Sequence, residues 1–148
     1  MVERKTTMLM LPVIGAIIAA IIGGVIWATI AILTEYELGI IAWGIGGLTG
    51  YMVAVFAKKQ TARVHQIIAV IACLAGIILG KYIIISYILN DGFKGIMNSQ
   101  TFHFFNYNFT GLFNGMDVVI ILFAIVTAWK LPSKMNQQKH VQPRKSLF

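Results

Sequence analysis

Lys81 is the clearest candidate for chemistry in this chain, because it stands in a long apolar stretch. If the helix around it extends to Leu89, Lys81 lies about 12 Å from the helix end at 1.5 Å per residue. An ammonium group at that depth needs a carboxylate partner, and the candidates are Asp117, Glu37 and Glu35. Such a pair would tie two helices together or form a relay or substrate site.

A second interpretation needs no buried charge. The segment 64–83 is already long enough to cross a bilayer, which would make Lys81 an interface anchor whose long side chain reaches the headgroups. We take this interpretation as the primary one and the buried pair as its alternative. For Glu37, the positive end of the following helix is a sufficient explanation. The alternative for Glu35 and Glu37 is a paired carboxylate site for a cation or a proton.

Catalytic and metal-binding patterns are weak. Asp91, His103 and Asp117 are possible acid–base groups for a membrane enzyme that acts on lipid, but no nucleophile–base pair accompanies them in the sequence. The His residues lack the spacing of metal ligands, and no nucleotide-binding or hydrolase motif is present. We therefore expect no cofactor and no metal site, and the sequence favours a non-enzymatic protein while leaving a membrane enzyme as an alternative.

The composition predicts the setting of these residues. The 148-residue chain is 58% hydrophobic and 11% charged, with a mean hydropathy of +0.81. Soluble domains are about a quarter charged, so this chain lacks the polar surface that water requires. We predict an all-α, polytopic membrane protein that folds as a four-helix transmembrane bundle. The basic residues that give the chain its net charge of +7 flank the apolar stretches. This placement favours anionic lipid headgroups as partners rather than nucleic acid.

We expect a single domain at 1–132, with spans at about 8–33, 38–57, 64–89 and 111–131, an outer aromatic loop at 90–110 and a basic cytoplasmic tail at 133–148. The first span has the character of an uncleaved signal anchor, with Pro12 in its first turn. The fourth begins near 110–114, which places Asp117 inside the helix. Every Lys and Arg except Lys81 and Lys94 then lies on one side. The positive-inside bias predicts a multi-pass protein of the cell membrane with both termini cytoplasmic, N-in and C-in.

Small residues mark the expected packing faces. Helices associate in lipid where small side chains let their backbones approach. The residues expected at such faces are Gly23, Trp27, Gly39, Trp43, Gly46, Gly50, Gly76 and Gly80. Packing within one bundle is the primary interpretation, and a homo-oligomer interface is the alternative.

Residues 37–50 read ELGIIAWGIGGLTG. This segment resembles an E-x-G-x-x-A-W-G-x-G-x-x-x-G hairpin motif of uncharacterised small integral membrane proteins of the bacterial inner membrane. Residues 117–130 are weakly similar to the last span of the same proteins. The resemblance implies a glycine-rich membrane hairpin and no mechanism.

The expected outer loop is rich in Phe and Tyr. These side chains would lie in the membrane interface, fold over the bundle or bind a ligand. Residues 105–109 alternate apolar and polar, which predicts a short extended or interfacial segment. The leading functional hypothesis is a non-enzymatic component of a homo- or hetero-oligomeric membrane complex. The alternative is a small oligomeric transporter or channel that uses the outer-side carboxylates and Lys81.

Overall fold

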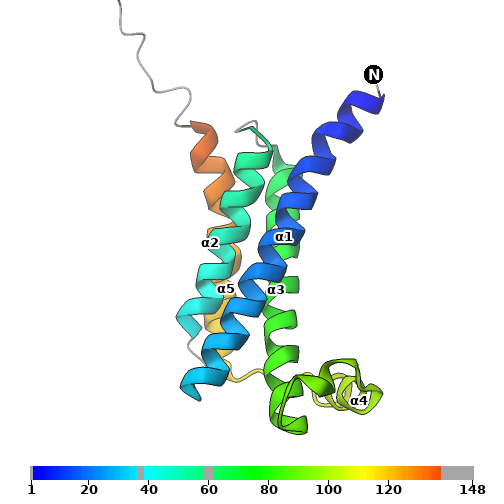
Figure 1. Ribbon diagram of the computed structural model, residues 1–148. Helices are drawn as coiled ribbons and strands as arrows, with labels where there is room; N and C mark the ends of the chain where they lie inside the picture. The colour runs from blue at the N-terminus through cyan, green and yellow to red at the C-terminus, as the bar shows by residue number, and fades with distance from the viewer. Residues whose placement is uncertain (1, 37–38, 59–61, 138–148) are drawn as a thin grey trace, which may run out of the picture.

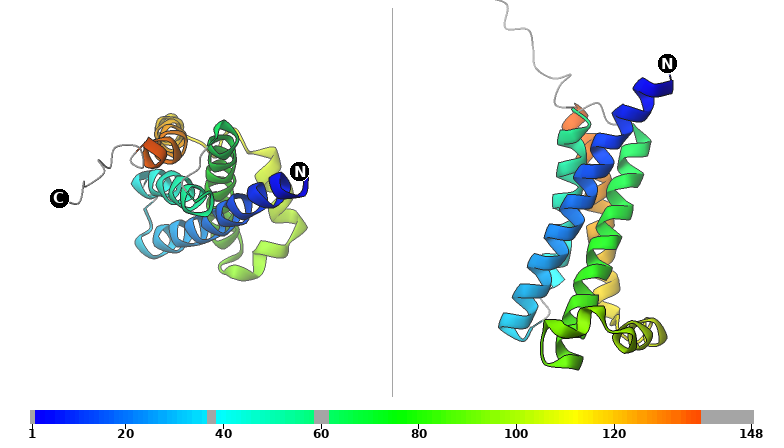
Figure 2. Two further views of the ribbon diagram at one scale, coloured as in Figure 1. Left: turned by 90° about the horizontal axis from the view of Figure 1, so that it is seen from above. Right: turned by 45° about the vertical axis from the view of Figure 1, so that its right-hand side comes forward.

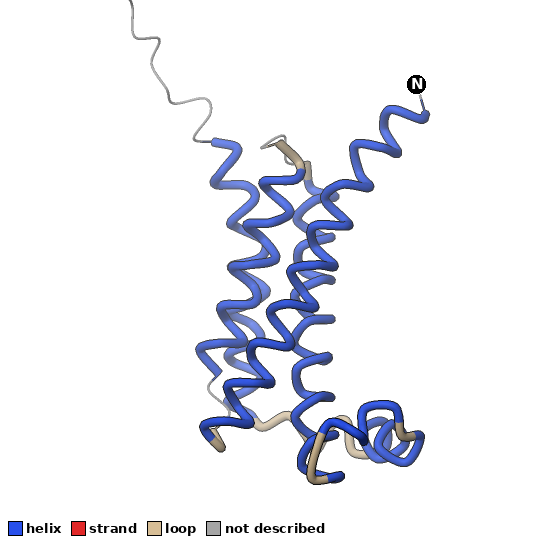
Figure 3. Tube along the Cα trace, in the orientation of Figure 1, coloured by secondary structure: helices blue, strands red, loops and turns tan. Residues whose placement is uncertain are grey.

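The computed structural model describes residues 2–36, 39–58 and 62–137, and this part of the chain contains helices and no strand (Figure 3). The helices are α1 (Val2–Thr34), α2 (Gly39–Phe56), α3 (Arg63–Asn90), the short 3-10 helix η1 (Phe93–Met97), α4 (Ser99–Tyr107) and α5 (Gly115–Gln137). Of these, α1, α2, α3 and α5 are long and apolar enough to cross a membrane. The prediction of an all-α, four-helix transmembrane bundle is confirmed.

The four spans run alternately up and down and form one bundle (Figures 1 and 2). The start of α1, the end of α2, the start of α3 and the end of α5 lie at one end, which we call the terminal end. The end of α1, the start of α2 and the segment with η1 and α4 lie at the opposite end, which we call the loop end. Both described ends of the chain therefore lie on the same side of the bundle.

Two helices are longer than the sequence suggested. Helix α1 begins at Val2, so Pro12 lies inside it rather than in its first turn. Helix α5 begins at Gly115 rather than near Gly111 and continues through Pro132 to Gln137. The first residues of the expected tail are therefore helical, and residues 138–148 lie outside the described part. Neighbouring helices can compensate for the backbone hydrogen bonds that proline removes from a membrane helix.

The bundle is packed unevenly. Helix α1 lies against α2 and α3, and α2 also lies against α3 and α5. Within the described ranges α5 does not contact α1. In the most apolar stretch of α5, 17% of the residues are buried, against 39%, 39% and 44% of the residues in the corresponding stretches of α1, α2 and α3. Helix α5 is thus the peripheral member, held mainly along its α2 side.

Small residues bring the helix backbones into direct contact. A Cβ atom built on Gly24 would lie 2.7 Å from the carbonyl oxygen of Gly76, and one on Gly76 would lie 3.0 Å from that of Ala20. At the α2–α5 seam, a Cβ on Gly50 would lie 3.2 Å from the Cα of Ala128. These approaches leave no room for a larger side chain.

The expected packing residues meet the following partners: Gly23 meets Ile45, Gly39 meets Ile120, Gly46 meets Ala124, Gly50 meets Ala128, Gly76 meets Ala20, and Gly80 meets Trp27. The glycine faces at these positions therefore lie between helices of the bundle. A homo-oligomer interface stays a prediction.

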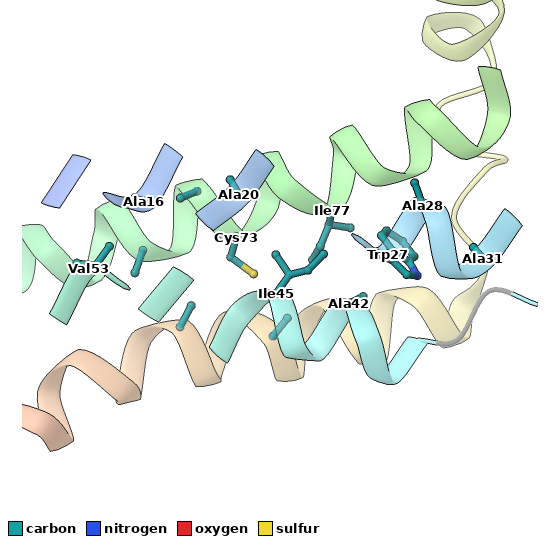
Figure 4. Close-up of a cluster of buried hydrophobic side chains, with 14 of the residues drawn as sticks. Ala16, Ala20, Trp27, Ala28, Ala31, Ala42, Ile45, Val53, Cys73 and Ile77 are labelled. Carbon is teal, nitrogen blue, oxygen red and sulfur yellow. The ribbon is translucent and has the colours of Figure 1, made fainter. Parts of the chain in front are cut away.

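The centre of the bundle combines alanines with a few larger side chains. In Figure 4, Ile45 of α2 and Ile77 of α3 point toward each other, with Cys73 beside them. These three side chains are 2%, 2% and 0% exposed, respectively. They fill the space that the small residues leave between α1, α2 and α3.

The loop-end segment is more helical than the sequence suggested. The sequence predicted a short extended or interfacial segment at 105–109. The extended conformation is wrong for residues 105–107, because α4 continues to Tyr107 and is followed by turns, and the interfacial placement stays a prediction. Asn98 caps α4, and its side chain accepts a hydrogen bond of 3.1 Å from the backbone N–H of Gln100. This local cap overrides the alternating pattern.

Candidate functional site

Lys81 lies inside the bundle and is paired. Its Nζ atom is 3.3 Å from Oδ2 of Asp117, and the side chains are 4% and 18% exposed. The primary interpretation, in which Lys81 reaches lipid headgroups, is therefore wrong. Helix α3 continues to Asn90, so Lys81 stands well before its end.

The helical register explains the direction of Lys81. Ile77 and Ile84, which precede and follow it by four and three residues, are 2% and 3% exposed. Residues at this spacing share one face of a helix. Lys81 therefore belongs to the core-facing side of α3, where its ammonium group can meet the start of α5.

Asp117 is fixed by the start of its own helix. Asn114 precedes Gly115, the first residue of α5, and its backbone N–H donates a 3.0 Å hydrogen bond to Oδ2 of Asp117. An acid three residues after a cap residue commonly satisfies one of the free N–H groups at a helix start. The same oxygen faces Lys81, so the cap also places the carboxylate for the ion pair.

An aromatic row adjoins the pair. Lys81 Nζ lies 5.6 Å from the ring centroid of Phe113, within the range of a cation–π interaction. The Phe113 ring lies 5.2 Å from Phe109, which lies 5.6 Å from Phe105. Phe105 in turn meets Tyr82 of α3 at 5.4 Å, edge to face. The loop-end segment and the ion pair are thus one connected structure.

An apolar groove of about 340 Å³ lies between α3 and α5 beside this structure. The turn after α4 contributes Phe109, Thr110 and Phe113 to its wall. The remaining lining residues come from the two helices: Leu74, Ile77, Ile78, Val118 and Ile121. Helices α3 and α5 are therefore joined at the loop end without close packing along that half.

The ion pair can act as a link between helices or as an exchangeable charge pair. Moving either charge into lipid alone costs at least about 2.5 kcal/mol on insertion scales, so each partner stabilises the other there. A pair that opens exposes a carboxylate, which can bind a proton or a cation, and an ammonium group, which can bind an anion.

The other predicted polar residues are not all brought to this pair. Glu35 is exposed in the turn after α1, with a φ of 57°. Glu37 lies outside the described residues. Asp91 caps the end of α3, and His103 is exposed on α4. In the described part of the chain, no hydrogen bond or ion pair joins Asp91, His103 and Asp117 to one another.

The two hairpin tryptophans have different environments. The Trp27 side chain is 2% exposed and packs against Gly80. Its indole N–H has no hydrogen-bond partner among the described residues. Trp43 is 47% exposed, and its Nε1 donates a 2.8 Å hydrogen bond to Thr127 of α5. Trp27 therefore brings an unsatisfied donor into the core, whereas Trp43 links α2 to α5.

Sequence reasoning missed several of these contacts. Phe113 lies at the start of the expected fourth span, and nothing in its neighbours indicates the cation–π contact with Lys81. The Asn114-x-x-Asp117 spacing before an apolar run is a readable cap signal that would have placed the start of α5. At the terminal end, Gln66 Nε2 donates a 3.1 Å hydrogen bond to the carbonyl of Trp129, a pairing that no local pattern indicates.

Among the residues that the structure describes, no group of three or more His, Cys, Asp and Glu side chains is placed to hold a metal ion. Comparison with protein-family models, with curated proteins and with solved structures gives no match for this chain.

Proposed function

We propose that this integral membrane protein is a non-enzymatic component of a membrane complex, which binds another transmembrane helix through one face of α2. We call this the open face of α2, and it comprises Ile40, Gly44, Gly47 and Tyr51. Their spacing places them on one side of a helix. Ile40 and Tyr51 are 68% and 50% exposed.

One observation carries this proposal. Within the described part of the chain, no atom of another helix lies within 4 Å of a Cβ built on Gly44 or Gly47. By contrast, the neighbouring Gly46 is pressed against the backbone of Ala124. Glycine lowers helix stability relative to alanine by about 1 kcal/mol, and in membranes it is enriched where helices approach closely. The partner helix belongs to a second copy of this chain or to another membrane protein.

Association in lipid vesicles tests the proposal. The chain is labelled with donor and acceptor dyes in separate samples and reconstituted together, and energy transfer is measured as the protein is diluted with lipid. Gly44→Ile and Gly47→Ile should reduce the transfer, because the added side chains hold the partner away. Both sites have free space, so the fold of each variant should be kept.

Ala75→Ile is the matched control, because Ala75 is also an exposed small residue on a span. It should leave energy transfer unchanged. A parallel pull-down from native membranes separates the two partners, since another membrane protein should be captured by the unsubstituted chain and lost with Gly47→Ile. The proposal is contradicted if the chain is monomeric in vesicles and the pull-down yields no membrane protein that is lost with Gly47→Ile.

We further infer that the protein lies in the cell membrane with its terminal end in the cytoplasm. Lys58, Arg63, Lys130 and Lys134 lie at that end of the described helices and connections. Basic residues beside spans are retained on the cytoplasmic side and are attracted to anionic headgroups by about 1 kcal/mol each. Tags on the two termini test this orientation. If a protease or an antibody added to intact cells reaches these tags, the termini lie outside the cell and the orientation is reversed.

A second candidate function is that of a small oligomeric transporter or channel, favoured by the buried Lys81–Asp117 pair. Ionisable residues inside membranes commonly mark ion or substrate paths. The unsatisfied indole N–H of Trp27 adds a donor beside Gly80, the residue before Lys81.

Flux in liposomes tests this second candidate. Proton, potassium and chloride flux is compared for the unsubstituted chain, Lys81→Met and Asp117→Asn, with Lys94→Met as the control for an exposed lysine. Flux that falls in the first two variants and not in the control supports transport. Equal flux in all four proteins, or flux in none, excludes a transport role for the pair.

A further inference from the structure

The segment formed by η1 and α4 projects sideways from the loop end of α3. Figures 1 and 2 both show it beside the bundle, close to the level where the spans end. Among the described elements, α4 contacts α3 and η1 and none of the other spans. A segment at this place meets the lipid that surrounds α3, which makes its surface chemistry informative.

One face of this segment is anchored on α3. Thr101 and Phe105 of α4 are 2% and 7% exposed. The Asn90 side chain donates a 3.0 Å hydrogen bond to the Thr101 hydroxyl, and the Tyr82 hydroxyl donates one of 2.8 Å to the carbonyl of Ile96. These contacts fix which sides of α4 remain open.

The remaining surface is apolar and aromatic. The exposed side chains are Phe93 at 61%, Met97 at 94%, Phe102 at 57%, Phe104 at 42% and Tyr107 at 90%. By helical spacing, Phe102 and Phe104 lie on the two flanks of the anchored face, whereas His103, Asn106 and Tyr107 lie on the side opposite to it. This is an amphipathic arrangement with the apolar side chains next to the bundle.

The charge of the segment also points to lipid. No Asp or Glu occurs from Gly92 to Met116, while Lys94 and His103 are exposed. Tyr is enriched in the headgroup layer, and Phe is common on the apolar face of helices that lie at the boundary between headgroups and acyl chains. Cationic groups beside them can meet the lipid phosphates. In water, such a patch would be an unusual liability.

We propose that η1 and α4 lie in the headgroup layer of the leaflet at the loop end and bind phospholipid there, with Phe102 and Phe104 entering the lipid and His103 facing water. The occupant of this surface is the lipid itself. The inference depends on the membrane setting and not on the proposed assembly role. Through Phe105, Phe109 and Phe113, the lipid contact is also connected to the Lys81–Asp117 pair.

Spin labelling of the full chain tests this placement. Single cysteines replace Phe102, His103 or Phe104 in a Cys73→Ala background and carry a nitroxide label. The protein is reconstituted in vesicles of phosphatidylcholine and phosphatidylglycerol. Collisions with oxygen, which concentrates in lipid, are compared with collisions with a water-soluble nickel chelate. Ile78→Cys on the exposed side of α3 and Lys58→Cys at the terminal end provide the lipid and water references.

At Phe102 and Phe104 we expect the oxygen-to-nickel ratio to lie between the references, and at His103 to match the water reference. Vesicles with and without phosphatidylglycerol should give different oxygen-to-nickel ratios at Phe102 and Phe104. The substitution Lys94→Gln should reduce that difference. Ratios at Phe102 and Phe104 that equal the water reference overturn the proposal. Low accessibility to both reagents at all three positions also overturns it, because it indicates that protein covers the segment.

Discussion

Helix α5 meets its two neighbours in different ways. Against α2 it packs closely, with Gly46 and Gly50 seated on the backbone of Ala124 and Ala128. Against α3 it is held by polar contacts toward its two ends, with an apolar groove beside the loop-end contact. The first seam depends on shape, and the second on charge and hydrogen bonds. A shape-dependent seam tolerates no added volume, whereas a charge-dependent seam tolerates volume and not the loss of a partner.

The largest expected effect tests the shape-dependent seam. Gly46→Ile should destabilise the folded chain by about 3 kcal/mol, because the new side chain meets the Ala124 backbone, which cannot move aside. Unfolding by sodium dodecyl sulfate in mixed micelles measures the change. Gly47→Ile is the matched control, one residue away and facing open space, and should change the free energy of unfolding by less than about 0.5 kcal/mol. Similar losses in both variants would remove the contrast between the two sides of α2.

The next effect tests the charge-dependent seam. In a double-mutant cycle of Lys81→Met and Asp117→Asn, the free energies of unfolding should show a coupling of about 1–3 kcal/mol. The double variant should be more stable than the sum of the single changes predicts, since it leaves neither charge alone. Additivity within about 0.5 kcal/mol would show that the 3.3 Å contact has no energetic weight.

A smaller effect is expected from the ring beside the pair. Phe113→Leu keeps an apolar side chain and removes the cation–π contact with Lys81, so unfolding should become easier by about 1 kcal/mol. Lys81→Met should abolish this difference. Phe102→Leu, on the exposed flank of α4, is the control and should have little effect on the unfolding of the bundle.

The smallest effect concerns the hydrogen bond within the shape-dependent seam. Trp43→Phe and Thr127→Ala should show a coupling of about 0.6 kcal/mol, the usual size for side-chain hydrogen bonds between membrane helices. A control cycle combines Trp43→Phe with Thr29→Ala. The Thr29 hydroxyl, like that of Thr127, donates a hydrogen bond within its own helix, but it does not accept one from Trp43. A Trp43–Thr127 coupling above that of Lys81–Asp117 would reverse the ranking of the two seams.

The architecture could be predicted because length and hydropathy act over whole helices. Four apolar stretches separated by polar turns leave few alternatives in a bilayer. The small residues also indicated where backbones approach, as at Gly76 and Gly80. They did not indicate that Gly44 and Gly47 would remain open while Gly46, between them, is packed. That outcome depends on which helix lies on which side of α2.

The candidate site was harder to predict, because it depends on where helices end. The sequence placed the third span at 64–89, close to the observed α3, but the segment 64–83 was also long enough to cross a bilayer, so hydropathy alone could not decide how deep Lys81 lies. The cap at Asn114 and Asp117 was a local signal that could have been used. The contact of Phe113 with Lys81 arises from a turn that brings distant residues together, and no periodic pattern records it. Which side of the membrane holds the termini stays a prediction.

The complete burial of Cys73 has a practical consequence. Its thiol lies where α1, α2 and α3 meet, so a thiol reagent dissolved in lipid reaches it when those helices separate. The alkylation rate of Cys73 in the unsubstituted chain therefore reports how often these helices separate by local opening of the bundle. A ligand or partner that holds the helices together should slow this reaction. The alkylation rate of Cys73 can therefore be used to screen for ligands or partners without adding a label.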